Sequence, residues 1–264
     1  MASSSQSQPR LPTPSDFPPN ATLSINPPTT GSPVNILILL HGLGDTHTSF
    51  TTLGKSLNLP ETVTISLRAP NPIPSIFTGS STPSFHWGDD ILFDETKGSI
   101  DPDGGFTTTR KILLSTIIKD VLIEKCHYPP RNILFYGYGQ GGMAALSIAV
   151  AASAASEDGE ELEFGGVVSI GGRLPASTLT AGSGQGKKGK CKTPVLLCGG
   201  YKSREVTRQA VDALKERFKD VEYVKWAKEG DGMPGSREEM LPIMKFFARR
   251  LRSRAGVPEG AVEV

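Results

Sequence analysis

Cysteine and histidine are both scarce in this sequence of 264 residues. Its three cysteines, Cys126, Cys191 and Cys198, form no CxxC pair, and an odd number cannot all be joined in disulfides. Neither a disulfide framework nor a zinc site is therefore indicated, and we predict no metal and no cofactor. All four histidines lie in the first half of the chain, and they are His41, His47, His86 and His127.

The sequence has no excess of charge of either sign, since 28 Lys and Arg residues face 27 Asp and Glu residues and leave a net charge of +1. A nearly neutral chain gives no electrostatic case for nucleic acid or an anionic membrane as a partner. No stretch reaches the roughly 20 apolar residues of a membrane-spanning helix, and the start lacks the apolar run of a secretory signal. We therefore expect a soluble protein without a transmembrane segment, located in the cytoplasm, with the nucleus as an alternative.

Large apolar side chains are nearly absent from residues 1–20, which are rich in Ser and Pro. Such a segment cannot offset its ordering entropy by burial. We predict a disordered tail over residues 1–20, a single domain over residues 21–253 and a flexible tail over residues 254–264.

Two further segments interrupt the pattern of the domain. Residues 156–166 are acidic, and residues 180–192 are rich in Gly and Lys. Both are predicted to be surface insertions. The lysines of the second segment could contact an anionic partner, although a solvated loop is the simpler interpretation.

Short apolar runs typical of buried β-strands lie at residues 34–42, 62–70, 132–137, 165–172, 194–200 and 221–226. Segments with apolar residues three and four positions apart, as in amphipathic helices, lie at residues 107–126, 141–155, 205–218 and 237–253. Strands that alternate with helices predict an α/β fold, in which helices cover both faces of a mostly parallel sheet.

The segment GYGQGG, residues 137–142, lies between a predicted strand and a predicted helix. In α/β hydrolases a GxSxG motif in this setting holds a serine nucleophile on a strained turn, but here Gly139 stands in place of the serine. The segment HGLGDT, residues 41–46, follows the first central strand, where an oxyanion-hole loop is expected. The backbone N–H groups of Leu43 and Gln140 are the predicted donors of that hole.

Together these motifs resemble those of the acyl-protein thioesterase and carboxylesterase family, a branch of the α/β-hydrolase superfamily. HGLGDT is similar to the oxyanion loop of that family, RAPNPIP to the segment after its second central strand, SFHWGDDI to its Trp-containing loop, and GYGQGG to its GFSQGG elbow. VVSIGGRLP and TPVLLCGG resemble its later strands, so that the resemblance extends from about Val34 to Leu251. It implies an α/β-hydrolase fold, and a homodimer is an assembly that the family allows.

The three catalytic positions of that family carry other residues here. The resemblance places the nucleophile at Gly139, the acid at Ser203 in GGYKS, and the base at Met233 in GDGM. Because no histidine follows residue 127, no shift of the alignment can supply the usual base. Gly, Ser and Met cannot accept and return a proton near pH 7, so the standard acyl-enzyme route is not expected.

Two hypotheses about function remain. In the first, the chain is a non-catalytic relative that keeps the binding pocket and takes up an acyl chain, an ester or an acylated peptide, or binds a partner protein. His86 and Trp87, in the loop that resembles the family's Trp-containing loop, are the candidates for lining this pocket.

In the second hypothesis, the chain is an active carboxylic-ester or palmitoyl-protein thioester hydrolase that uses unconventional residues. His86 with Asp89 and Asp90 is one candidate set, and Cys198 is another. Simpler interpretations are a loop histidine and a buried structural thiol. Asp231 and Glu229 could activate water near position 233, although two acids in a turn are usually solvated.

Overall fold

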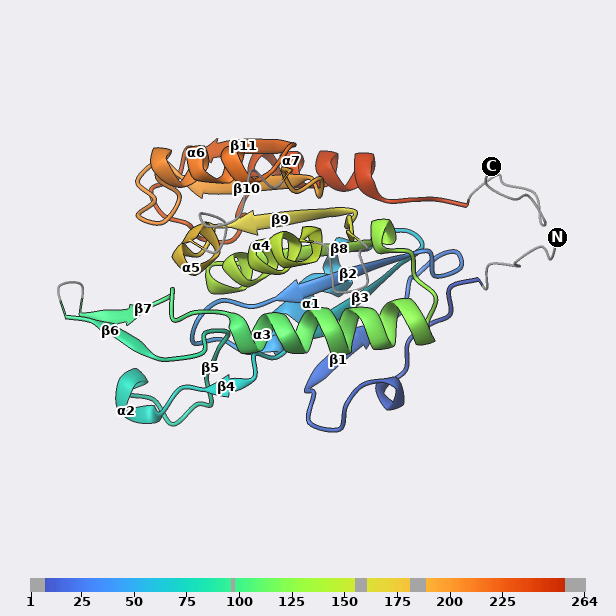
Figure 1. Cartoon of the computed structure of the whole chain (residues 1–264), viewed down its shortest axis with the longest axis horizontal. Helices are drawn as coiled ribbons and strands as arrows, with labels where there is room; N and C mark the ends of the chain where they lie inside the picture. The colour runs from blue at the N-terminus through green and yellow to red at the C-terminus, as the bar shows by residue number, and fades with distance from the viewer. Residues whose placement is uncertain (1–7, 96–97, 155–160, 181–188, 255–264) are drawn as a thin grey trace.

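The computed structural model describes residues 8–95, 98–154, 161–180 and 189–254. The chain is built around a seven-stranded sheet in the order β1-β3-β2-β8-β9-β10-β11 (Figure 1). β1 pairs antiparallel with β3, and the other pairs of this sheet are parallel. The seven strands are β1 (Leu23–Asn26), β2 (Asn35–Leu40), β3 (Thr62–Leu67), β8 (Ile133–Tyr138), β9 (Gly166–Ile170), β10 (Val195–Gly200) and β11 (Val221–Trp226).

All six strands that the sequence predicts are present in this sheet. Every residue of β2, β3, β9 and β10 is buried, as their continuous apolar runs indicate. The sequence pattern does not predict β1, whose residues are only half-buried because it lies at an edge of the sheet.

The four predicted helices are also present, with one difference in type: α3 (Thr107–Lys111) continues into a π-helix, η2 (Ile112–Lys125). The other three are α4 (Gln140–Ser153), α6 (Arg208–Arg217) and α7 (Arg237–Arg250). The sequence pattern misses α1 (His47–Leu57), which is rich in the weak helix formers Thr and Ser. Smaller elements are η1 (Pro14–Asp16), β4 (Asn71–Pro72), α2 (Ser75–Thr78), β5 (Phe85–His86), β6 (Leu92–Asp94), β7 (Ser99–Asp101), η3 (Pro130–Asn132) and α5 (Ala176–Thr180).

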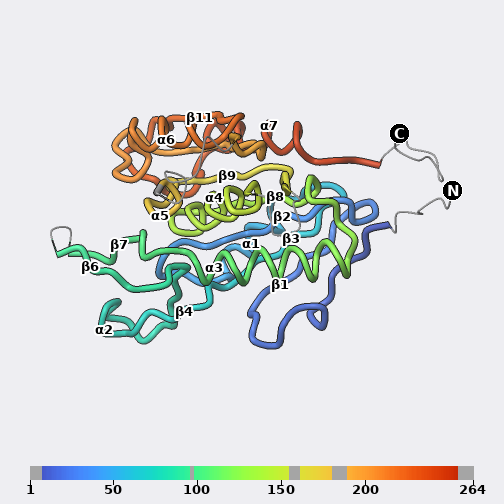
Figure 2. The backbone as a smooth tube through the Cα atoms, in the orientation of Figure 1, coloured from blue at the N-terminus to red at the C-terminus, as the bar shows by residue number. Residues whose placement is uncertain are grey.

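Successive side chains of the central strands point to opposite faces of the sheet. Ile36 and Ile38 of β2 belong to a hydrophobic cluster with residues of η2, α4 and α6. Leu37 and Leu39 belong to a second cluster with residues of α1 and α7. Helices therefore cover both faces of the sheet, which confirms the predicted α/β fold (Figure 2).

The carboxyl ends of the parallel strands point to one end of the molecule, on the left in Figure 1, where α2 and the β6–β7 pair also lie. Both ends of the described chain lie on the opposite side (Figure 2). Ligands of open α/β sheets bind at the carboxyl ends of the strands, so this end is where a functional site is expected. None of the helices in the described ranges is long and apolar enough to cross a membrane.

Residues 8–20 of the predicted N-terminal tail make contacts with the domain, while residues 1–7 lie outside the described part. Phe17 is 6% exposed and belongs to the larger hydrophobic cluster. The Arg10 guanidinium pairs with Asp16 at 2.6 Å, and the Arg10 N–H donates to the Cys126 carbonyl at 3.1 Å. One buried aromatic ring, one ion pair and a backbone contact thus hold a segment whose composition suggested disorder.

The ends of both predicted insertions are also packed onto the domain. Phe164 is 1% exposed and Cys191 is 2% exposed. Cys191 forms a parallel β-bridge with Phe218, next to the end of α6. Surface insertion therefore does not describe these ends. Residues 155–160, 181–188 and 255–264 lie outside the described residues, and they include part of the first predicted insertion, most of the second and most of the C-terminal tail.

Candidate active site

The turn between β8 and α4 has the geometry of a nucleophile elbow. Gly139 has φ 51° and ψ −118°, a region that strains residues with a side chain. Its N–H donates to the Ile170 carbonyl at 2.8 Å, and its carbonyl accepts from the Met143 N–H at 3.1 Å. A Cβ atom built on Gly139 would meet nothing within 4 Å. The turn therefore has room for a serine side chain that the sequence does not provide.

The flanking glycines of GYGQGG are required by close packing. A Cβ on Gly137 would lie 2.4 Å from the Gly141 carbonyl oxygen, and one on Gly141 would lie 2.3 Å from that of Leu40. Such distances are shorter than side-chain atoms tolerate, so only glycine fits. The contact of Gly141 with the end of β2 also brings the start of α4 next to the loop that contains Leu43.

The two predicted oxyanion-hole donors, the N–H groups of Leu43 and Gln140, lie in the loop that follows β2 and at the elbow, respectively. Within the described ranges, neither the Leu43 N–H nor the Gln140 N–H donates a hydrogen bond to the protein. The Gln140 side chain is 2% exposed; its Oε1 accepts from the Trp87 N–H at 2.7 Å, and its Nε2 donates to the Pro102 carbonyl at 2.9 Å. Gln140 thus ties two loops to the elbow, a role that its sequence position alone did not indicate.

Ser203 and Asp231 form a hydrogen-bonded pair between the loops that follow β10 and β11. The Ser203 hydroxyl donates to Asp231 Oδ2 at 2.6 Å and accepts from the Val206 N–H at 2.7 Å. Asp231 Oδ1 accepts from the Gly200 N–H at 3.0 Å. Both oxygens of the half-buried Asp231 therefore accept hydrogen bonds from the protein, a contact that its position in a turn did not indicate.

Asp231 also lies close to the elbow. A Cβ on Gly171 would be 2.6 Å from the Asp231 Cβ, and Gly171 follows Ile170, whose carbonyl accepts the Gly139 N–H. Gly139, Ser203 and Asp231 are thus linked through the end of β9. Position 231 is not one that the family resemblance assigns.

The Met233 side chain packs against neighbouring hydrophobic residues. It packs against the hydrophobic cluster that contains Trp226, and its carbonyl accepts from Lys228 Nζ at 2.8 Å. The same ammonium pairs with Glu239 at 2.9 Å and lies 4.1 Å from the centre of the Trp226 ring. A thioether cannot transfer protons, so Met233, to which the family resemblance assigns the base, offers no group for that role.

His41, the histidine of the HGLGDT loop, is fully buried. Its Nε2 accepts from the Ala69 N–H at 3.0 Å, so its Nδ1 carries the proton and donates to the Gly42 carbonyl at 2.8 Å. Burial lowers the pKa of His41 below its ordinary value. With both ring nitrogens bonded to the backbone, His41 is a structural residue.

His86 and Trp87, the two predicted pocket residues, are buried in the structure. His86 is 4% exposed, and burial lowers its pKa against the opposing charge of Asp90. Trp87 is 1% exposed, and its Nε1 donates to the His41 carbonyl at 2.8 Å. Thr109 Oγ1 donates to the Trp87 carbonyl at 2.6 Å, so Trp87 belongs to the packed core beside the elbow.

The other residues considered for unconventional chemistry have structural partners. Cys198 is fully buried, and burial raises the pKa of its thiol to about 12, so it is not a thiolate near neutral pH. Burial would raise the pKa of Asp89, but the N–H groups of Thr107 and Thr108 outweigh it and lower that pKa. Glu229 accepts from Lys202 Nζ at 2.9 Å on the surface.

One ion-pair cluster near the site was not indicated by any sequence motif. The Arg173 guanidinium bonds Asp103 at 2.7 Å and Glu205 at 2.9 Å. Arg173 follows Gly172, whose added Cβ would lie 2.4 Å from the Gly139 carbonyl oxygen. The cluster therefore joins three loops around the elbow through residues far apart in the sequence.

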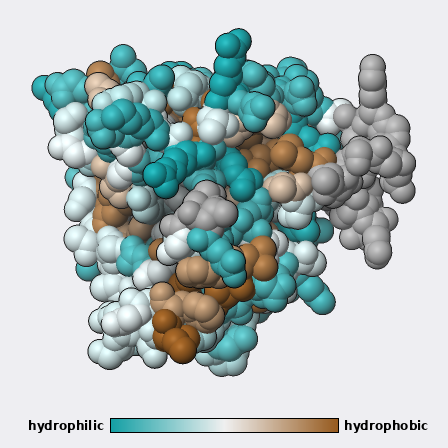
Figure 3. Space-filling model, turned by 90° about the vertical axis from the view of Figure 1, so that its left-hand side faces the viewer, coloured by the Kyte–Doolittle hydropathy of each residue, from teal (hydrophilic) through white to brown (hydrophobic). Residues whose placement is uncertain are grey.

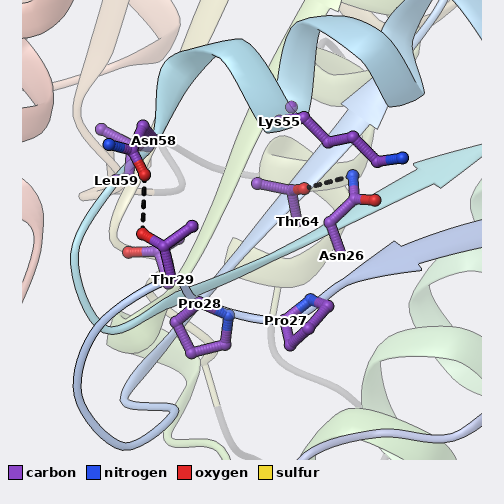
Figure 4. A pocket seen from close by; sticks show the side chains of 10 residues that line it. Asn26, Pro27, Pro28, Thr29, Lys55, Asn58, Leu59 and Thr64 are labelled. Atoms are coloured by element: carbon purple, nitrogen blue, oxygen red, sulfur yellow. Dashed lines mark hydrogen bonds between the residues drawn. The ribbon is translucent and has the colours of Figure 1, made fainter.

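A groove on another part of the surface lies beside α1 and the edge strand β1 (Figure 4). Its polar side chains bond to one another: Asn26 Nδ2 donates to Thr64 Oγ1 at 3.0 Å, and Thr29 Oγ1 donates to Asn58 Oδ1 at 2.6 Å. These side chains already have partners, so the groove gives no sign of a ligand.

The sheet order, the elbow between β8 and α4, and the loop that follows β2 together define an α/β hydrolase fold. A family model described as Phospholipase/Carboxylesterase matches residues 23–251. The chain belongs to this family.

Two relatives in sequence agree with this assignment. An uncharacterized hydrolase of Mycosarcoma maydis is 31% identical over 87% of this chain and 81% of its own length. An uncharacterized hydrolase of Schizosaccharomyces pombe is 28% identical over 82% of this chain and 83% of its own length.

Two solved structures illustrate the likeness in fold. Acyl-protein thioesterase 2 of Zea mays has a TM-score of 0.60 at 23% identity, over 88% of this chain and 99% of that chain. Esterase PE8 has a TM-score of 0.64 at 19% identity, over 88% of this chain and 99% of that chain. These likenesses confirm the predicted α/β-hydrolase fold, and the family model confirms the predicted family.

Proposed function

We propose that this chain is a family member without serine-hydrolase catalysis, which binds an acyl chain, an ester or an acylated peptide, or a partner protein. The observation that carries the proposal is the hydrogen bond from Ser203 to Asp231, in the region where an acid and a base would orient each other. Gly139 has no attacking atom, and Met233 cannot remove a proton.

An acyl ligand is supported by apolar surface at the same end of the molecule. Ile76 and Phe77 of α2 are 86% and 48% exposed, and Leu92 and Phe93 of β6 are 48% and 52% exposed. Figure 3 views this end and shows hydrophobic residues gathered in its lower part, at the height where α2 lies in Figure 1. Contiguous exposed apolar surface of this kind is typical of a binding site.

The ester group itself could be held by the backbone of the elbow. The N–H groups of Leu43 and Gln140 have no protein acceptor in the described part of the chain. A carbonyl oxygen placed between them would satisfy both donors. The same backbone that would stabilise an oxyanion in an active relative would here bind a ground-state ester.

The alternative is an active carboxylic-ester or palmitoyl-protein thioester hydrolase that uses unconventional residues. It is favoured by membership of a family of hydrolases, and by the carboxylate of Asp231 near the elbow. Against it, both Asp231 oxygens already accept hydrogen bonds, which stabilise the ionised carboxylate and make it a weaker base toward water.

A fluorophosphonate probe separates the two functions, because it labels only an activated nucleophile. We expect no labelling of the purified full-length chain, and no turnover of aryl esters or palmitoyl thioesters above that of a Leu43→Pro variant, which lacks one hole donor. Stoichiometric labelling would refute the non-catalytic proposal. Binding of a non-hydrolysable palmitoyl thioether, measured by calorimetry, tests the acyl ligand independently.

Two further parts of the proposal concern the cell and the assembly. We propose a cytoplasmic location, with the nucleus as the alternative, and a homodimer on the basis of family resemblance. Fractionation of cells and sedimentation equilibrium of the purified chain would test these two points separately.

A further inference from the structure

A second hollow lies at the far end of α4, away from the elbow. Its lining includes Arg110 of α3, Val150 and Ala154 at the end of α4, Thr178 of α5, and Arg217 at the end of α6. Its cavity volume is about 160 Å³. Because α4 has 14 residues, the hollow lies about 20 Å from the elbow.

Two guanidinium groups line this hollow without a carboxylate partner. Arg217 Nη2 donates only to the Thr178 carbonyl at 3.4 Å, and Arg110 Nη2 only to Thr107 Oγ1 at 3.4 Å. Among the residues that the structure describes, neither guanidinium group has an ion-pair partner, and no Asp or Glu lines the hollow. By contrast, Arg173 binds two carboxylates. Two like charges that share one hollow favour an anion between them.

The partial negative charge at the end of α4 does not cancel the preference of the hollow for an anion. The last carbonyls of a helix carry partial negative charge, which disfavours an anion. Here the carbonyls of Ala149, Val150, Ala151 and Ala152 accept, in order, from Cys191 Sγ, Ser153 Oγ, the Ala154 N–H and the Leu162 N–H. Each of these four carbonyls therefore has a donor, which reduces the negative potential that the end of α4 presents to the hollow.

We propose that this hollow binds a small molecule that carries a phosphate monoester on an apolar group. A phosphate monoester has a charge of about −1.5 to −2 near pH 7, which matches two guanidinium groups, whereas a carboxylate would leave one uncompensated. The planar guanidinium fork binds phosphate oxygens in pairs. The aliphatic wall of Val150, Ala151 and Ala154 accommodates the apolar part of the ligand.

Calorimetry with the full-length chain tests the proposal, with phenyl phosphate as the ligand and benzoate as the carboxylate of similar shape. We expect saturable binding of phenyl phosphate at one site, and weaker binding of benzoate. Arg110→Gln and Arg217→Gln should each weaken phenyl phosphate binding by about tenfold or more. The matched control is Arg208→Gln, which removes an exposed guanidinium from the other end of α6 and should leave binding unchanged.

A second measurement covers the case in which a variant fails to fold. In the wild-type chain, phenyl phosphate should shift the methyl NMR signals of Val150, Ala151 and Ala154 and leave those of Leu43 unchanged. The proposal is overturned if binding does not saturate, if a variant that carries both Arg110→Gln and Arg217→Gln binds as the wild type does, if benzoate binds equally well, or if the shifted methyl groups lie elsewhere. None of these outcomes bears on catalysis at the elbow, because the two sites share no residue.

Discussion

The hydroxyl of Ser203 donates a hydrogen bond to Oδ2 of Asp231 at 2.6 Å, across the loops that follow β10 and β11. In an active triad, a carboxylate accepts a hydrogen bond from the histidine base, and the family resemblance assigns the carboxylate to the first of these loops and the histidine to the second. Here the carboxylate lies on the second loop and the donor is an uncharged hydroxyl on the first. The two loops remain joined, but the bond cannot relay a proton to the elbow.

Substitution of Ser203→Ala should therefore affect stability and leave function at the elbow unaltered. It removes the donor to a carboxylate that is close to Gly171 and partly buried, so the free energy of unfolding should fall by about 1–3 kcal/mol. Urea denaturation measures this difference. Ser56→Ala, on the exposed side of α1, is the control and should change stability little. An equal effect of both substitutions would mean that the Ser203–Asp231 bond stabilises nothing.

A serine at position 139 alone should not create an enzyme. The space around Gly139 accepts the side chain, but its φ of 51° makes the substitution cost about 1–3 kcal/mol. Because Met233 is no base, Gly139→Ser should show neither ester turnover nor fluorophosphonate labelling above the level of Gly139→Ala, which introduces the same strain without a hydroxyl. Labelling of the serine variant alone would reveal a base that the structure does not identify.

Rebuilding the triad requires a fourth substitution that the family pattern does not suggest. With Gly139→Ser, Ser203→Asp and Met233→His, the new carboxylate at position 203 would face Asp231 at hydrogen-bond distance. Like charges so close cannot both ionise, which raises one of the two pKa values. We expect the triple variant to react poorly with fluorophosphonate, and the addition of Asp231→Asn to raise the labelling rate by about tenfold or more.

Measurement of the labelling rate of the two variants in parallel, with thermal melts of each, checks this expectation. If the triple variant reacts as fast as the quadruple variant, Asp231 does not interfere with the rebuilt acid. If both variants melt normally and neither reacts, the elbow does not place the serine at position 139 where fluorophosphonate can react with it.

The sequence predicts the centre of this fold well and its margins poorly. The continuous apolar runs of β2, β3 and β10 are buried on both faces, as is typical of the central strands of a parallel sheet. β1 and α1 lack such a pattern: α1 holds several Thr and Ser residues, and its Gly54 is needed for packing, since a Cβ there would lie 2.6 Å from Thr64 Oγ1. Residues 8–20 pack through Phe17 and the Arg10–Asp16 pair, which composition does not reveal.

Within the site, the motifs locate the elbow and its neighbouring loop, but not the contacts between distant segments. The Ser203–Asp231 bond spans 28 positions, and the Arg173–Asp103 pair spans 70. Hydrogen bonds of this kind depend on how the loops at the end of the sheet meet, which no local pattern encodes. The family resemblance assigns the position of the base to Met233, whereas the carboxylate that lies against Gly171, beside the elbow, belongs to Asp231.

Stability should fall as the pH is lowered, because buried histidines are kept neutral by the fold. Burial lowers the pKa of His41, His47 and His86. In the unfolded chain these groups take up protons as the pH falls through about 6.5, before the folded chain does. The free energy of unfolding therefore decreases below that pH, by up to about 1.4 kcal/mol per pH unit for each such histidine.

Urea denaturation at a series of pH values between 8 and about 5 measures this slope. His86→Gln should make it shallower, because it removes one of the groups that the fold keeps neutral. His41→Gln should also make it shallower while lowering stability at every pH, since the ring bonds both Ala69 and Gly42. A slope that is the same in the wild type and both variants would show that carboxylates, and not these histidines, govern the acid sensitivity of the fold.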